Sequence, residues 1–136
     1  MKYICILGFF IISLTLSSAY AADTRRVVRV VDGDTVILDG GEKVRLLGIN
    51  TPELGFHGKP VEAGALAAKS LLQQWVLNKQ VSVVRDVERK DHYGRTLAHL
   101  FIEGSGHINV LMLQSGLATL SLHPPNLKYY AELLLG

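Results

Sequence analysis

The sequence contains a single cysteine, Cys5, which lies in the apolar segment at the N-terminus. The remainder of the chain therefore has no disulfide, and a packed core must stabilise it. Charge is nearly balanced, because 14 lysines and arginines stand against 12 aspartates and glutamates, a net charge of +2. A protein that holds a polyanion through its overall field carries a much larger positive charge. Any binding of a polyanion must therefore come from a local site.

The first 21 residues have the pattern of a secretory signal peptide. Lys2 gives a positive start, residues 4–16 are almost wholly apolar, and Ala19-Tyr20-Ala21 forms a small-residue cleavage site. The alternative is a transmembrane anchor, but this run is shorter than the roughly 20 residues that a spanning helix needs. We expect cleavage after Ala21, secretion or export to the periplasm, and no membrane anchor. Residues 22–136 then form one domain.

Short β-branched runs separated by turn residues dominate the first half of the chain. Asp32-Gly33 and Asp39-Gly40 each lie between two such runs, which predicts hairpins. Later segments space their apolar residues as a helix does. Gly116 directly follows one of these segments, residues 108–115, where a glycine often ends a helix. The predicted strands are residues 27–31, 36–38, 44–49, 80–86 and 95–102, a polar loop is 88–94, and the predicted helices are 61–76, 108–115 and a last one from about Leu127.

Strands followed by one helix, two strands and a further helix do not give the regular alternation of a parallel α/β fold. We predict a mainly β (α+β) fold, a five-stranded OB-type barrel with two to three packed helices. The five histidines fall in separate predicted elements without a helical pair, so we expect no histidine metal site.

The turn Asp32-Gly33-Asp34 has one acid more than a hairpin requires, whereas Asp39-Gly40-Gly41 makes a turn with one acid. Two adjacent carboxylates repel each other, and a bound cation would relieve that repulsion. Hard cations such as calcium take carboxylate, amide, carbonyl and water oxygens as ligands. Taken alone, however, the turn fits a solvated polar turn better, because short motifs often match by chance.

Other residues strengthen the functional interpretation. Arg45 lies in an apolar strand, where it needs a partner or an exposed position, and Arg95 follows a Tyr-Gly turn. Glu53 follows Pro52 at the end of a predicted strand, where catalytic groups often lie. A divalent ion, a carboxylate base and two arginines are together what phosphodiester hydrolysis requires.

In order and spacing, three strings resemble the staphylococcal nuclease (thermonuclease) family: VDGDTV, VRLLGINTPE and DHYGRTLA. The resemblance runs from Arg26 to Asn126. It implies an OB barrel with added helices, and a Ca²⁺-dependent endonuclease that hydrolyses DNA and RNA with little sequence specificity and leaves 3′-phosphate ends. We expect DNA and RNA as partners and a monomeric protein.

The resemblance also assigns roles to residues that match the motifs. The residues expected at the calcium ion are Asp34, Asn50, the backbone carbonyl of Thr51 and, near the ion, Asp32. The residues expected at the substrate are the phosphate-binding Arg45 and Arg95, the general base Glu53, and the nucleotide-binding Tyr93 and His123.

Three departures from the family pattern leave an alternative open. Asn50 replaces a calcium-binding aspartate of the best-known members, and Ser121 and His123 replace tyrosines that line their base pocket. The sequence also stops at Gly136, inside the expected last helix, as a natural short form or a truncated one. The alternative function is a catalytically weakened nucleic-acid-binding module of the same fold. A small secreted barrel without nucleic-acid contact would leave the three motifs unexplained.

Overall fold

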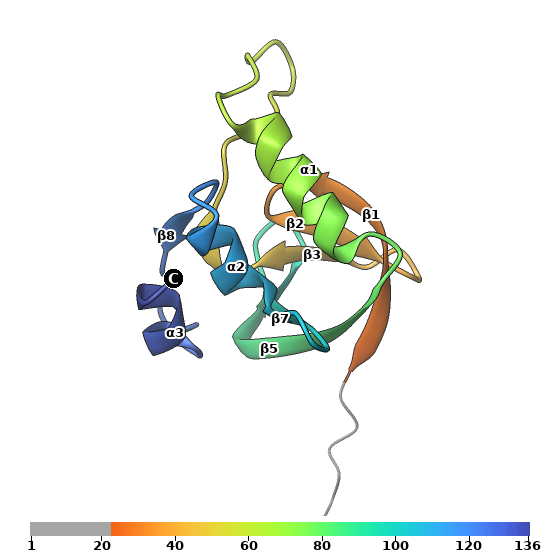
Figure 1. Ribbon diagram of the computed structural model, residues 1–136, viewed down its shortest axis with the longest axis vertical. Coiled ribbons are helices and arrows are strands. Elements are labelled where there is room, and N and C mark those ends of the chain that lie inside the picture. The colour runs from red at the N-terminus through yellow and green to blue at the C-terminus, as the bar shows by residue number, and fades with distance from the viewer. Residues whose placement is uncertain (1–22) are drawn as a thin grey trace, which may run out of the picture.

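The computed structural model describes residues 23–136, and the predicted signal peptide lies outside this range (Figure 1). The described chain consists mainly of β-strands, with three helices among residues 23–136. The elements are β1 (Thr24–Asp32), β2 (Thr35–Leu38), β3 (Lys43–Leu46), β4 (Gly48–Asn50), α1 (Ala65–Val76), β5 (Gln80–Lys90), β6 (Thr96–Ile102), β7 (Gly106–His107), α2 (Ile108–Gln114), β8 (Thr119–Ser121) and α3 (Tyr130–Leu134).

Five strands pair in a closed ring. Antiparallel pairing joins β1 to β2, β2 to β3, β5 to β6 and β1 to β5. The ring closes where β3 pairs in parallel with β6, with Arg45 opposite Leu97. The predicted fold class, mainly β with two to three helices on five paired strands, is confirmed. Closure leaves these strands with few free edges, which suits a small domain without disulfides.

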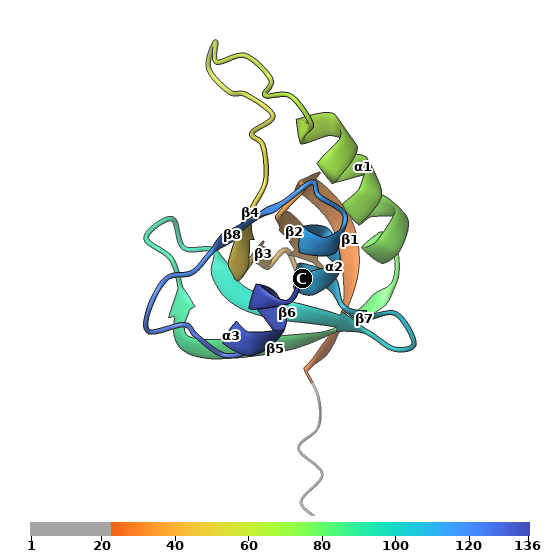
Figure 2. The ribbon, with the colours of Figure 1, turned by 60° about the vertical axis from the view of Figure 1, so that its left-hand side comes forward.

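The core fills the ring and the space below α1 and α2. In β3 and β5 buried residues alternate with more exposed ones, as the period of two predicts, whereas irregular pairing in β1 leaves the buried Val27 and Val30 three positions apart. Helix α1 lies across β1 and β2, and α2 lies nearer the C-terminal segment (Figures 1 and 2). The core side chains with the least exposure include Val27, Val36, Leu38, Val44, Leu46, Ile49, Ala68, Leu72, Val76, Leu100, Ile108 and Met112.

Glycine backbones with positive φ account for two errors in the predicted boundaries. The predicted strand 44–49 is two strands, because the backbone turns at Gly48, whose φ is +77°, and β4 pairs with β8 instead of staying in the ring. The predicted helix 61–76 begins only at Ala65, after Gly64 with φ of +85°. Val61, the first residue of the predicted helix, lies before α1 and is 53% exposed.

Tertiary pairing moved three other boundaries. The predicted loop 88–94 is shorter, because β5 continues through Lys90, which pairs with Thr96. Arg95 lies just before β6, and the last helix begins at Tyr130. The prediction for Gly116 is confirmed, since its φ is +77° and its N–H donates to the Leu113 carbonyl just after α2. Within residues 23–136, no helix is both long and apolar enough to cross a membrane.

Candidate active site

The acidic turn between β1 and β2 forms one wall of the site. Its first carboxylate caps the turn, because Asp32 Oδ1 accepts a hydrogen bond from the Asp34 N–H at 3.1 Å. Asp34 is 5% exposed, and its Oδ1 accepts a hydrogen bond from the Thr35 hydroxyl at 3.0 Å. The turn therefore carries two neighbouring carboxylates, one of them buried.

Thr51, the residue after β4, binds the acidic turn directly. Its backbone N–H and its hydroxyl both donate to Asp34 Oδ2, at 3.0 and 3.1 Å. Gly33 is packed between Thr51 and α1. A Cβ at Gly33 would lie 2.6 Å from the Ala68 Cβ and 2.9 Å from the Thr51 hydroxyl oxygen. The turn needs glycine here because a side chain would collide with both neighbours.

Arg45 of β3 reaches across to the same turn. Its Nη2 lies 3.2 Å from Asp34 Oδ2 and donates to Asn50 Oδ1 at 3.1 Å. Its Nη1 donates to the carbonyls of Leu46 and Ile49, at 2.6 and 2.9 Å. The pairing of Thr35 with Arg45 across β2 and β3 brings the guanidinium beside the turn. Four polar contacts thus stabilise the charge of Arg45, which would be costly in an apolar strand without a partner.

The surroundings of Asp32 shift its ionisation. Burial, together with the negative charge of Asp34, raises the pKa of Asp32 to about 6. Arg45 forms its ion pair with Asp34. Among residues 23–136, the Asp32 carboxylate therefore has no cationic partner of its own. This part of the site retains negative charge that a cation would stabilise.

Arg95 is held by its own turn. The Asp91 carboxylate accepts hydrogen bonds from the backbone N–H of Arg95 at 2.9 Å and from its Nε at 2.7 Å. Burial favours the protonated form of Asp91, but the hydrogen bonds and charge of Arg95 outweigh it, so the pKa of Asp91 lies below its usual value. The Arg95 guanidinium also lies 5.4 Å from the centre of the Tyr93 ring, a cation–π contact.

One cavity of about 620 Å³ brings the two arginines together. Arg45 and Arg95 both line it, with Lys90, Asp91 and His123 also on its wall. The Nε2 of His123 lies 3.0 Å from the Ser121 hydroxyl, so the two residues that replace tyrosines of the family contact each other. Tyr93 is 73% exposed and lies outside this lining.

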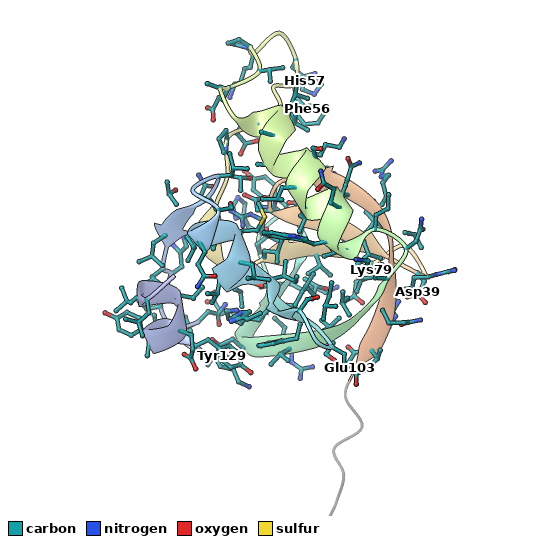
Figure 3. The ribbon with its side chains drawn as sticks, viewed as in Figure 1. Asp39, Phe56, His57, Lys79, Glu103 and Tyr129 are labelled. Carbon is teal, nitrogen blue, oxygen red and sulfur yellow. The ribbon has the colours of Figure 1, made fainter. Side chains whose placement is uncertain are left out.

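Glu53 does not line the arginine cavity. It lines a second cavity of about 550 Å³, formed with Phe56, His57, Lys59 and Glu62 in the loop between β4 and α1. Phe56 and His57 lie at the outer end of this loop, above α1 (Figure 3). Arg45 thus contacts Asp34 and Asn50 directly, and Thr51 contacts Asp34. The structure joins Arg45 to Arg95 through a shared cavity, and it leaves Glu53 outside that cavity.

Three residues that the sequence did not single out support those that it did. Asp91 holds Arg95, and Glu62 accepts a hydrogen bond from the Glu53 N–H. Asn126, also on the arginine cavity, exchanges two hydrogen bonds with the backbone of Glu88 in β5. Asp91 is the first residue of the DHYGRTLA string, so the sequence motif could have indicated it. The other two contacts join residues that no local pattern connects.

The donors near Asp34 fit a weakly held hard cation. Asp32 and Asp34 supply adjacent carboxylates, and Arg45 pairs with Asp34 alone, so the turn keeps an excess of negative charge of the kind that calcium binds. Within residues 23–136, however, no group of three or more acidic, histidine or cysteine side chains is arranged to hold a metal ion. The amide oxygen of Asn50 is already bonded to Arg45. Any cation here would depend chiefly on the two aspartates.

Residues 43–135 match the sequence profile of a family described as staphylococcal nuclease homologue. The thermonuclease of Staphylococcus intermedius is 42% identical over 106 residues, which cover 76% of this chain and 62% of that protein. The thermonuclease of Staphylococcus hyicus is 36% identical over 109 residues, 78% of this chain and 64% of that protein. Endonuclease YncB of Bacillus subtilis is 30% identical over 112 residues, which cover 79% of this chain and 53% of that protein.

The chain spans less than two thirds of the length of these curated relatives. The matched region nevertheless includes β3 with Arg45, the segment from Asn50 to Glu53, and the Asp91–Arg95 turn. With more than half of its residues in the match, this chain belongs to the staphylococcal nuclease homologue family.

Proposed function

We propose that this protein is a calcium-dependent endonuclease that hydrolyses DNA and RNA with little sequence specificity and leaves 3′-phosphate ends. The observation that carries the proposal is the cavity lined by Arg45 and Arg95, with Arg45 in contact with the buried Asp34. Two guanidinium groups that line one cavity, one of them against a buried carboxylate, match a phosphodiester, whose charge grows in the transition state of hydrolysis. Thermonuclease and endonuclease are also the names of similar proteins.

The arginines differ in their readiness to bind phosphate. Asp91 engages Nε and the backbone N–H of Arg95, and no hydrogen bond within residues 23–136 engages its Nη groups. Those groups are free to form a planar pair of hydrogen bonds with two phosphate oxygens. Arg45 is already bonded to two carbonyls and to Asn50, so it acts from a fixed position. Fixed donors stabilise transition-state charge without reorganising.

Asp32 and Asp34 would hold the calcium ion, with Asn50 and the Thr51 carbonyl as further oxygen donors. When bound, the ion would polarise a phosphoryl oxygen and orient a water molecule. Glu53 would accept a proton from the attacking water as the general base. Its position two residues after Thr51 supports this role, because the Thr51 N–H and hydroxyl anchor the segment to Asp34.

One observation favours the second candidate, a weakened nucleic-acid-binding module. The Asn50 amide oxygen accepts a hydrogen bond from Arg45, so a cation would have to compete for that oxygen. An amide also lacks the charge that strengthens calcium binding. Under this alternative, the arginine cavity binds phosphate but turnover is slow.

Other properties extend the proposal. Residues 1–21 are proposed as a signal peptide that directs residues 22–136 to the periplasm or the exterior. The domain is proposed to act there as a monomer without a membrane anchor.

The test is cleavage of plasmid DNA and of RNA by the purified protein, with calcium or with excess chelator. We expect cleavage of both in about millimolar calcium, the range of weak extracellular sites, and none with chelator. The Arg95→Ala variant should lose about 10²–10³ in rate, as for one strong transition-state donor. Full activity in chelator would overturn the metal mechanism. Binding without cleavage at any calcium concentration would favour the second candidate.

A further inference from the structure

The backbone of Glu53 is clamped by Glu62, nine residues further along the chain. The Glu53 N–H donates to a carboxylate oxygen of Glu62, Oε2, at 2.8 Å. In return, the Glu62 N–H donates to the Glu53 carbonyl at 2.9 Å. The two residues therefore close the base of the loop by a reciprocal pair of hydrogen bonds, one of which uses a side chain.

The loop above this clamp is organised mainly by its own contacts. The Lys59 N–H donates to the Phe56 carbonyl at 3.2 Å. Gly55 has φ of +75°, and a Cβ there would lie 2.4 Å from the Lys59 carbonyl oxygen. The loop extends beyond the end of α1, away from the strands (Figures 1 and 2). These contacts shape the loop but do not tie it to the barrel.

Glu62 supplies such a tie, because it lies just before α1. Its carbonyl accepts a hydrogen bond from the Ala65 N–H at 3.1 Å, at the start of the helix. One turn later, Ala68 packs against Gly33 of the acidic turn so closely that no Cβ fits at Gly33. A continuous chain of packed and bonded groups thus runs from Glu53, through Glu62 and α1, to the turn that carries Asp34.

We propose that Glu62 is a positioning residue, whose carboxylate holds Glu53 at a set place relative to the acidic turn. The segment is then anchored on both sides of Pro52. Thr51 is bound to Asp34 on one side, and Glu53 is bound to Glu62 on the other. The inference rests on the proposed role of Glu53 as general base. A general base must lie within hydrogen-bond reach of the proton that it takes, so small displacements lower the rate.

Two variants separate a positional role from an effect of charge. Glu62→Ala removes the acceptor for the Glu53 N–H, whereas Glu62→Gln keeps an acceptor oxygen of the same reach without the charge. Glu103→Ala is the matched control, because it removes an exposed carboxylate between β6 and β7, far from the loop (Figure 3). Melting temperatures show whether each variant is folded.

The experiment measures kcat and KM for cleavage of a short DNA substrate in saturating calcium. We expect Glu62→Ala to lower kcat by about 10- to 100-fold, the scale of a small misplacement of a catalytic group, with much less change in KM. Glu62→Gln should restore most of the lost kcat, and Glu103→Ala should match the wild type. Wild-type kcat in folded Glu62→Ala would overturn the inference. Equally low kcat in both Glu62 variants would also overturn it, because charge rather than the acceptor would then matter.

Hydrogen exchange of the Glu53 amide tests the clamp without any activity. We expect faster exchange in Glu62→Ala than in Glu62→Gln or the wild type, because only the alanine variant lacks the acceptor. Unchanged exchange in Glu62→Ala would refute the clamp. Failure of the proposed function looks different: the wild type would not cleave, or Glu53→Gln would keep full turnover, while the exchange rates could still follow the clamp.

Discussion

Lowering the pH from 7.5 to 5 should destabilise the fold through His99, a side chain of β6 that is 1% exposed. Its Nδ1 lies 3.0 Å from Nε2 of His107, and the Tyr129 ring packs edge-on against it. Its Nε2 is buried without a hydrogen-bond partner among the described residues. Burial, with a smaller effect of His107, lowers the pKa of His99 from 6.5 to about 4.

The direction of the effect follows from this shift. The unfolded chain takes up a proton near pH 6.5, whereas the folded chain does so only near pH 4. Stability from the neutral ring is therefore complete above pH 6.5 and is lost as the pH falls toward 4. By linkage, His99 alone removes about 2 kcal/mol of unfolding free energy between pH 7.5 and 5. His107, whose pKa burial also lowers to about 4, acts in the same direction.

Urea unfolding at both pH values checks this prediction, with wild type compared to His99→Phe. Phenylalanine keeps an aromatic ring in the core but cannot ionise, and the carboxylates contribute equally to both proteins. The wild type should lose about 2 kcal/mol more than the variant on acidification. His92→Phe, at an exposed position, should keep the wild-type dependence. Equal losses in wild type and His99→Phe would refute the argument that the buried ring must be neutral.

Three further changes test the site. Asp91→Ala should lower kcat/KM for DNA by about 10- to 100-fold, because Arg95 would no longer be held in place. Asp91→Asn keeps an acceptor oxygen and should lower kcat/KM less. Similar kcat/KM values for both variants would contradict the role of Asp91 in holding Arg95. Asn50→Asp adds a negative charge beside Asp34. It should therefore lower the calcium concentration needed for half-maximal cleavage, and it should lower the melting temperature in chelator. An unchanged calcium requirement would mean that Asn50 is not a ligand. Gly33→Ala should lower the free energy of unfolding, measured with urea, by about 1–3 kcal/mol, because the added methyl group overpacks against Ala68. In the double variant, Ala68→Gly should restore part of that free energy. If the losses of the two single variants simply add, the contact is not supported.

Much of the fold was predictable because its signals are local. The Asp-Gly turn at Gly33 lies between runs of β-branched residues, so the β1–β2 hairpin could be predicted from neighbouring residues alone. Gly116 followed α2 as expected. The break at Gly48 was not predictable, because the apolar run continues through it. It depends on the pairing of β4 with β8, about 70 residues later, and on Leu133 of α3, which fills the space where a Gly48 side chain would lie.

The candidate site divides in the same way. The charged residues were recognisable because a second acid in a tight turn and an arginine in an apolar strand are costly without a partner. Their partners were not recognisable. Arg45 faces Asp34 because β2 and β3 pair in one register, and a shift by one residue would turn it to the other face.

By itself, the sequence determined the chemical groups and the turns, since these depend on residues close together in the chain. Only the tertiary structure decided which groups meet. The parallel pairing of β3 with β6 brings Arg45 and Arg95 to one cavity, although 50 positions separate them. The loop between β4 and α1 contains Glu53, which lines a separate cavity and is bonded to Glu62. Such contacts follow from ring closure and core packing, which are properties of the whole chain and leave no local signal.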